Sequence, residues 1–148
     1  LLGYVLLCAT CGFFISVIFQ LAHVVEGVDN PITDQDNQIK LEWAVHEIRT
    51  TSDFATDNWF VTLFTGGLNF QVEHHLFPDI PARRYAEMSV EVQEICQRYG
   101  QHYNKGSLVK QFGQVCGRIL RYALPSKSKV LKDDKAMAQA VMVEKLAA

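Results

Sequence analysis

Residues 1–22 carry no charged side chain, and this run limits what the chain can fold into more than any other feature. A helix from Leu1 to Leu21 would be about 30 Å long, which matches the hydrocarbon core of a bilayer. We therefore predict a transmembrane helix over residues 1–22. The alternatives are a buried helix of a soluble protein and a secretory signal peptide, although neither the basic leading segment nor the cleavage site of a signal peptide is visible.

Every lysine and arginine lies at or after Lys40. The basic, polar flank beyond the apolar run predicts that His23 and all later residues lie on the cytosolic side. The formal net charge of −2 gives no indication of nucleic-acid binding. Because the chain does not begin with Met and is apolar from its first residue, we expect it to be the C-terminal part of a longer membrane protein.

The four cysteines do not indicate a redox or metal site. Cys8 and Cys11 form a C-x-x-C pair inside the apolar run, whereas a reactive dithiol needs polar, partly exposed surroundings. We expect both to be small, buried side chains on the helix. Cys96 and Cys116 fall in the part predicted to be cytosolic and are expected to be reduced.

The remaining pattern predicts short helices, and the fold class is all-α. We expect one helix over 41–49, one from Trp59 that is capped by Asp57 or Asn58, and two amphipathic helices over 81–100 and 107–122. The segment from Trp59 to Phe64 is too short to cross a membrane, so it either lies in the headgroup layer or packs against other helices. The apolar stripe over 107–122 either rests on an anionic membrane or packs within its own domain. We expect residues 1–125 to form one domain, with 23–125 as a cytosolic cap, and 126–148 to be a mobile tail.

Residues 71–75 read Gln-Val-Glu-His-His and have a metal-ligand spacing. On a helix, residues three and four positions apart share a face, so Gln71 would lie over both His74 and His75. Adjacent helical residues point about 100° apart, so the two imidazoles are placed to reach two different metal ions. Neutral imidazole suits iron, zinc, copper and nickel.

The stretch from Gln71 to Pro78 resembles the third histidine box of the membrane fatty acid desaturases. Glutamine in the first position resembles the front-end branch, which desaturates between an existing double bond and the carboxyl end. The segment 43–54, the approach 66–70 and the spacing of Cys96, Gly100 and Tyr103 resemble the same family. The resemblance covers roughly residues 10–123.

This resemblance implies a centre of two irons held by eight or nine histidines, which uses dioxygen and two electrons to place a double bond in an acyl chain. It implies that His74 and His75 are iron ligands. His23 matches a further histidine ligand at the end of the family's last transmembrane helix. The chain has five histidines in all, so the first two histidine boxes would lie upstream of Leu1.

The resemblance leaves the roles of Gln71, His46 and Glu73 open. An amide is a weaker ligand than imidazole, so Gln71 either binds iron directly, binds it through water, or orients a neighbouring histidine. His46 matches a histidine of the front-end pattern W-x-x-H-Q, with Glu47 in place of glutamine, and a structural or supporting role is expected. Glu73 either hydrogen-bonds a ligating imidazole or faces water. His102 is expected to be exposed and without function.

The implied partners are a membrane, an acyl substrate and an electron donor. The substrate would be linked to CoA, a phospholipid or a sphingoid base, and the electrons would come from cytochrome b5 or a ferredoxin-like protein. In a eukaryote, the protein would lie in the endoplasmic reticulum. The alternatives are a related di-iron hydroxylase, acetylenase or sphingolipid desaturase, and a truncated membrane protein without enzymatic activity.

Overall fold

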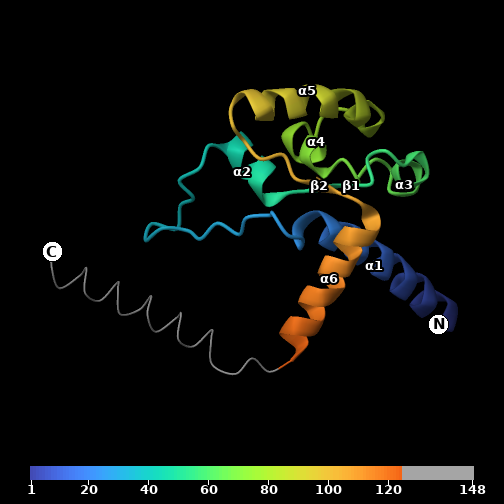
Figure 1. Ribbon diagram of the computed structural model, residues 1–148. Coiled ribbons are helices and arrows are strands. Elements are labelled where there is room, and N and C mark those ends of the chain that lie inside the picture. The colour runs from blue at the N-terminus through green and yellow to red at the C-terminus, as the bar shows by residue number, and fades with distance from the viewer. Residues whose placement is uncertain (125–148) are drawn as a thin grey trace, which may run out of the picture. The chain divides into compact units, whose positions relative to one another are not determined.

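The computed structural model describes residues 1–124, coloured in Figure 1. The chain separates into two units at the boundary between Cys116 and Gly117. The fold described here is that of the first unit, Leu1–Cys116. The tail predicted over 126–148 lies outside the described residues.

The first helix, α1 (Leu2–His23), contains 22 residues and is strongly apolar. By length and composition it is able to cross a membrane, and it lies near the N-terminus of the chain. Among its residues only Leu21 and Ala22 are buried. The prediction that Cys8 and Cys11 are buried is wrong for the described residues, because both side chains lie on an exposed stretch of α1.

Two of the short helices begin and end close to their predicted bounds. The second helix, α2 (Trp43–Thr50), falls on the segment predicted over 41–49. The third, α3 (Trp59–Phe64), begins after Asn58, whose side-chain oxygen accepts hydrogen bonds from the backbone N–H groups of Phe60 and Val61 at 3.1 and 3.2 Å. Of the two predicted caps, Asn58 is therefore the one that acts.

The histidine-bearing helix, α4 (Gln71–Leu76), comes next and confirms the helical placement of the box. It is followed by a 3-10 turn, η1 (Ala82–Arg84), and by α5 (Tyr85–Arg98). Gly100, with a φ of +64°, follows α5, as predicted. The last described helix, α6 (Leu108–Ala123), matches the amphipathic helix predicted over 107–122.

A two-stranded parallel sheet departs from the all-α prediction (Figure 1). Strand β1 (Asp53–Phe54) pairs with β2 (Lys105–Gly106), and Asp53 lies opposite Lys105. A strand of two residues is too short to show the alternation that identifies a strand in a sequence. The pairing nevertheless joins the segment before α3 to the segment before α6.

Two apolar clusters hold the first unit together. One joins the end of α1 to β1 and α6 through Leu21, Val25, Val28, Phe54, Ala55 and Val115. The other lies between α2, α4 and α5 and consists of Ile48, Val72, Val92 and Cys96. Because α4 packs on both α2 and α5, its position depends on contacts from the segments before and after it in the chain.

Gly67 permits a close approach between two segments next to the histidine box. Its φ is +86°, and a Cβ placed on it would lie 2.9 Å from the Cβ of Ala82. We expect Gly67→Ala to destabilise the full-length protein by about 2 kcal/mol, since it adds both a steric clash and a strained backbone. Gly66→Ala is the matched control: its φ is +64° but nothing lies within 4 Å of the new Cβ, so about 1 kcal/mol is expected. Thermal unfolding in detergent measures both, and equal losses would contradict the steric argument.

Candidate metal centre

His75 lies at the centre of a group of polar side chains contributed by α1, α2 and α4. Its Nδ1 is 2.8 Å from the Glu47 carboxylate, and its Nε2 is 3.1 Å from the amide nitrogen of Gln71. An amide NH₂ group can only donate, so Nε2 of His75 accepts and the ring proton lies on Nδ1. Burial lowers the pKa of His75, an effect that Glu47 partly opposes, and this favours the neutral ring.

His23 comes close to His75, although 52 residues separate them in the sequence. The two ring centroids are 5.2 Å apart at an interplanar angle of 72°. Nδ1 of His23 donates to the backbone carbonyl of Thr50 at 3.0 Å, because a carbonyl can only accept. His23 and His75 therefore share one tautomer, with the proton on Nδ1 and the lone pair on Nε2, which is the form that binds a metal through Nε2. In His75 this lone pair accepts from Gln71, so a bound metal would take the place of that hydrogen bond.

His74 is the third ring of the cluster. Its centroid lies 5.7 Å from that of His75, with the rings almost perpendicular at 86°. Its Nδ1 is 3.4 Å from the hydroxyl of Tyr85, the first residue of α5. The fold thus brings together the three histidines that the sequence singles out as candidate ligands.

The donor set suits iron, but the cluster would supply only part of a centre. Among residues 1–124, no group of three or more His, Cys, Asp or Glu side chains is arranged to hold one metal ion. The three rings are adjacent rather than convergent on a single point, as expected if they were divided between the two ions of a pair. Neutral imidazoles held through Nδ1 are suitable iron ligands, so the residues present fit an iron centre that other ligands complete.

Glu73 differs from both expectations, because in the described residues it is buried and its hydrogen-bond partner is Tyr103 rather than a candidate imidazole. Its side chain is fully buried, and one carboxyl oxygen lies 2.9 Å from the hydroxyl of Tyr103. The same hydroxyl contacts Asp53, whose other oxygen accepts the backbone N–H of Val72 at 2.9 Å. Glu73 therefore belongs to a buried network that ties α4 to β1 and to the segment before β2.

The two carboxyl groups of this network do not both ionise readily. Burial raises the pKa of Asp53 to about 6 and that of Glu73 to about 8, and the nearby charge of Asp53 adds to the effect on Glu73. The Tyr103 hydroxyl has one proton and cannot donate to both acids. If Glu73 is protonated, it donates to the Tyr103 hydroxyl oxygen, and the hydroxyl in turn donates to Asp53. Both contacts are then hydrogen bonds.

His46 lies outside the network around His75. It is half-buried, and its Nδ1 is buried without a hydrogen-bond partner among residues 1–124. The supporting role expected for it stays a prediction. His102 is exposed, as expected.

Sequence reasoning missed Glu47, Thr50, Tyr85 and the Asp53–Tyr103 pair as neighbours of the box. In the sequence, Glu47 is notable only because it replaces the glutamine of the W-x-x-H-Q pattern. Tyr103 is notable only for its spacing from Cys96 and Gly100. Metal-binding imidazoles often donate their second ring N–H to a carboxylate. A search of the sequence for such a carboxylate was the one way to identify Glu47.

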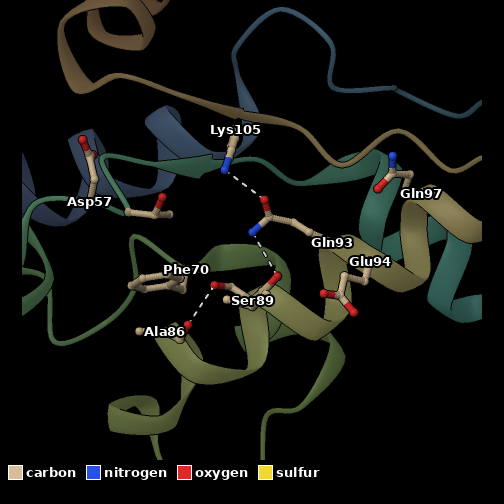
Figure 2. Close-up of a pocket in the computed structure, with 10 residues that line it drawn as sticks. Asp57, Phe70, Ala86, Ser89, Gln93, Glu94, Gln97 and Lys105 are labelled. Carbon is tan, nitrogen blue, oxygen red and sulfur yellow. Dashed lines mark hydrogen bonds between the residues drawn. The ribbon is translucent and has the colours of Figure 1, made fainter.

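A separate pocket of about 470 Å³ lies beside α5 and contains none of the candidate ligands (Figure 2). Gln93 occupies its wall, donating to the carbonyl of Ser89 and accepting from the Lys105 ammonium group, both at 2.9 Å. Ser89 in turn donates to the carbonyl of Ala86 at 3.0 Å. These polar groups satisfy one another, so the pocket does not add to the candidate centre.

The sequence profile of the fatty acid desaturases matches residues 1–107. The chain belongs to the fatty acid desaturase family. It is 43% identical over 95 residues to the sn-1 linoleoyl-lipid 6-desaturase of Synechocystis, a match that covers 64% of this chain and 26% of the relative. It is 36% identical over 103 residues to the acyl-lipid (8-3)-desaturase of Mortierella alpina, covering 66% of this chain and 23% of that one.

A more distant match is the NADPH-dependent stearoyl-CoA 9-desaturase of Mycobacterium tuberculosis, 33% identical over 113 residues, which are 76% of this chain and 26% of the relative. The chain therefore spans about a quarter of the length of the relatives it matches. No solved structure matches it. The 6-desaturase and the (8-3)-desaturase are front-end desaturases, in agreement with the glutamine at position 71.

Proposed function

We propose that this chain is part of a front-end acyl desaturase and supplies His23, His74 and His75 as ligands of a pair of irons. The observation that carries the proposal is the pairing of His23 with His75. Their rings lie 5.2 Å apart, and each is held through Nδ1, so that the lone pair of each ring is on Nε2. Metal binding by His75 would replace the hydrogen bond that its Nε2 accepts from Gln71. Further histidines of the full-length protein would complete the centre.

The proposed reaction removes two hydrogens from neighbouring carbons of an acyl chain. Dioxygen is reduced to two water molecules by these two hydrogens together with two electrons and two protons from outside. When bound, the irons supply the oxidising power that no side chain has. The residues of this chain hold the ligands in place and keep His75 in one tautomer.

The substrate is proposed to be an acyl chain linked to a lipid, because two of the closely matching relatives are named for acyl-lipid substrates. CoA and sphingoid carriers remain the alternatives. The electron donor is proposed to be cytochrome b5 or a ferredoxin-like protein. Gas chromatography with mass spectrometry of lipids from cells that express the full-length gene tests the assignment. A new double bond supports a desaturase, whereas a hydroxyl group or a triple bond would favour a related di-iron enzyme.

A truncated membrane protein without activity is the alternative from another class. The reading frame upstream of Leu1 separates the two: HxxxH and HxxHH boxes there would support the enzyme, and a stop codon would contradict it.

We further propose that α1 crosses the bilayer and that His23 lies at its cytosolic end, in the endoplasmic reticulum if the organism is a eukaryote. Phe64 of α3 stacks edge-on against Phe14 of α1 with centroids 5.6 Å apart. Phe14 lies nine residues before His23, which is about 14 Å along a helix. With α1 across the membrane, α3 would therefore lie at the depth of the hydrocarbon rather than in the cytosol.

The surroundings of α3 support this depth. Trp59, Phe60, Leu63 and Phe64 are all exposed in the described unit. A groove of about 570 Å³ between α1, α3 and the start of α6 is lined almost entirely by apolar side chains. We propose that lipid hydrocarbon covers this surface, because exposing it to water would be unfavourable.

A fluorescent probe tests the position of α3. We expect a probe on Leu63→Cys of the full-length protein, with its other exposed cysteines replaced, to be quenched by lipids brominated in the acyl chains. The same probe on Val90→Cys of α5 is the control, since Val90 is similarly exposed at 60% compared with 70% for Leu63. Equal quenching at both sites would contradict the placement of α3 in the hydrocarbon.

A further inference from the structure

We propose that Glu47 is a positioning residue for His75, holding its Nδ1 proton so that Nε2 is directed to the metal. The inference rests on the proposed function, since it needs His75 to be a ligand. Glu47 lies on α2, 28 residues before His75, and its carboxylate oxygen is 2.8 Å from Nδ1. This is the shortest hydrogen bond formed by any of the three candidate histidines in the described residues.

The fold holds this contact from both sides. Helices α2 and α4 pack against each other, with Ile48 and Val72 in the same apolar cluster, so Glu47 and His75 are carried by elements whose separation is fixed. The side chains of His75 and Glu47 are 31% and 17% exposed. A charged hydrogen bond screened in this way from most of the solvent is stronger than one at the surface.

The hydrogen-bond directions leave one tautomer. The carboxylate accepts from Nδ1, and the amide of Gln71 donates to Nε2 at 3.1 Å. Without Glu47, only the Gln71 amide would hold the ring, and a metal bound at Nε2 would displace that contact, so the ring could turn about its χ2 angle. A carboxylate behind a ligating imidazole also makes the ring a stronger donor, and loss of such a partner typically costs 10- to 100-fold in metal affinity.

Glu47→Gln is an informative conservative variant, because glutamine has nearly the same shape as glutamate. Its side-chain carbonyl can still accept the Nδ1 proton, but without the negative charge. It should keep the orientation of the ring and lose the added donor strength. Glu47→Ala removes both.

The experiment measures iron retained by the purified full-length protein against increasing concentrations of a chelator. We expect Glu47→Ala to weaken iron retention by about 10- to 100-fold and Glu47→Gln to give an intermediate loss. Glu42→Gln is the matched control, since it removes a negative charge from an exposed residue at the start of the same helix and should leave retention unchanged. In activity assays, kcat should fall while KM for the acyl substrate stays the same.

A double-mutant cycle separates positioning from general stability. If Glu47 acts through His75, then adding Glu47→Ala to His75→Ala should cause no further loss of iron. An equal loss in both backgrounds, or wild-type retention in Glu47→Ala, would overturn the inference while leaving the proposed function standing. A wild-type protein that binds no iron at all would overturn both.

Discussion

Replacing His75 by alanine in the full-length protein is expected to abolish the unsaturated product and to lower the iron content of the purified protein. The ring is held by Glu47 and Gln71 and lies beside both other candidate ligands. Loss of one ligand of a metal centre removes the oxidising chemistry rather than slowing a step that side chains could perform. His74→Ala is expected to have the same effect.

Two measurements check this result. Gas chromatography of lipids from expressing cells gives the product, and metal analysis of purified protein gives the iron content. His102→Ala is the matched control, because His102 is exposed and lies outside the cluster. It should leave product and iron at the wild-type level. Wild-type product in His75→Ala, from protein expressed at the normal level, would refute the ligand role.

Removing the Asp53 carboxylate is expected to cause the largest loss of stability among the substitutions considered. Asp53→Ala would leave the buried N–H of Val72 and the hydroxyl of Tyr103 without this partner. We expect a loss of about 3 kcal/mol, since unsatisfied buried polar groups each cost about 1–3 kcal/mol. Asp53→Asn keeps an oxygen for Val72 and an NH₂ group for Tyr103, so we expect it to cost less than about 1 kcal/mol near pH 7.

The pH dependence of stability gives a second test of this network. The pKa of Asp53 is raised to about 6 in the folded protein from an ordinary value of 3.8. Folding therefore favours the protonated acid, and the stability this contributes is complete below pH 3.8 and is lost as the pH rises through about 6. Asp53→Asn cannot titrate, so its melting temperature should fall less than that of the wild type between pH 5 and 8. Parallel melting curves across this range would contradict the raised pKa.

Several elements could be predicted from the sequence because their signals are local. A charge-free run identifies a long apolar helix, a polar residue before Trp59 predicts the helix start that Asn58 caps, and Gly100 marks the end of α5. The spacing of Gln71, His74 and His75 similarly places them on one short helix. These signals depend on residues a few positions apart, which is the range over which helix geometry acts.

The surroundings of the box could not be predicted in the same way. Helix α4 has six residues, and the buried ones are Gln71, Val72 and Glu73, so no apolar periodicity shows which side faces the core. Glu73 therefore looked like a residue that either touches a ligand or faces water. Its burial follows from Asp53 and Tyr103, which lie 20 residues before it and 30 residues after it.

By itself, the sequence determined the apolar helix, the order of the short helices, the family and the identity of the three candidate ligands. Only the tertiary structure decided that His23 meets His75, that Glu47 holds the latter through Nδ1, and that Glu73 is enclosed with Asp53 and Tyr103. The physical reason is that side-chain pairing across 28 to 52 residues depends on how α1, α2 and α4 pack, whereas composition and helical spacing describe neighbours along the chain.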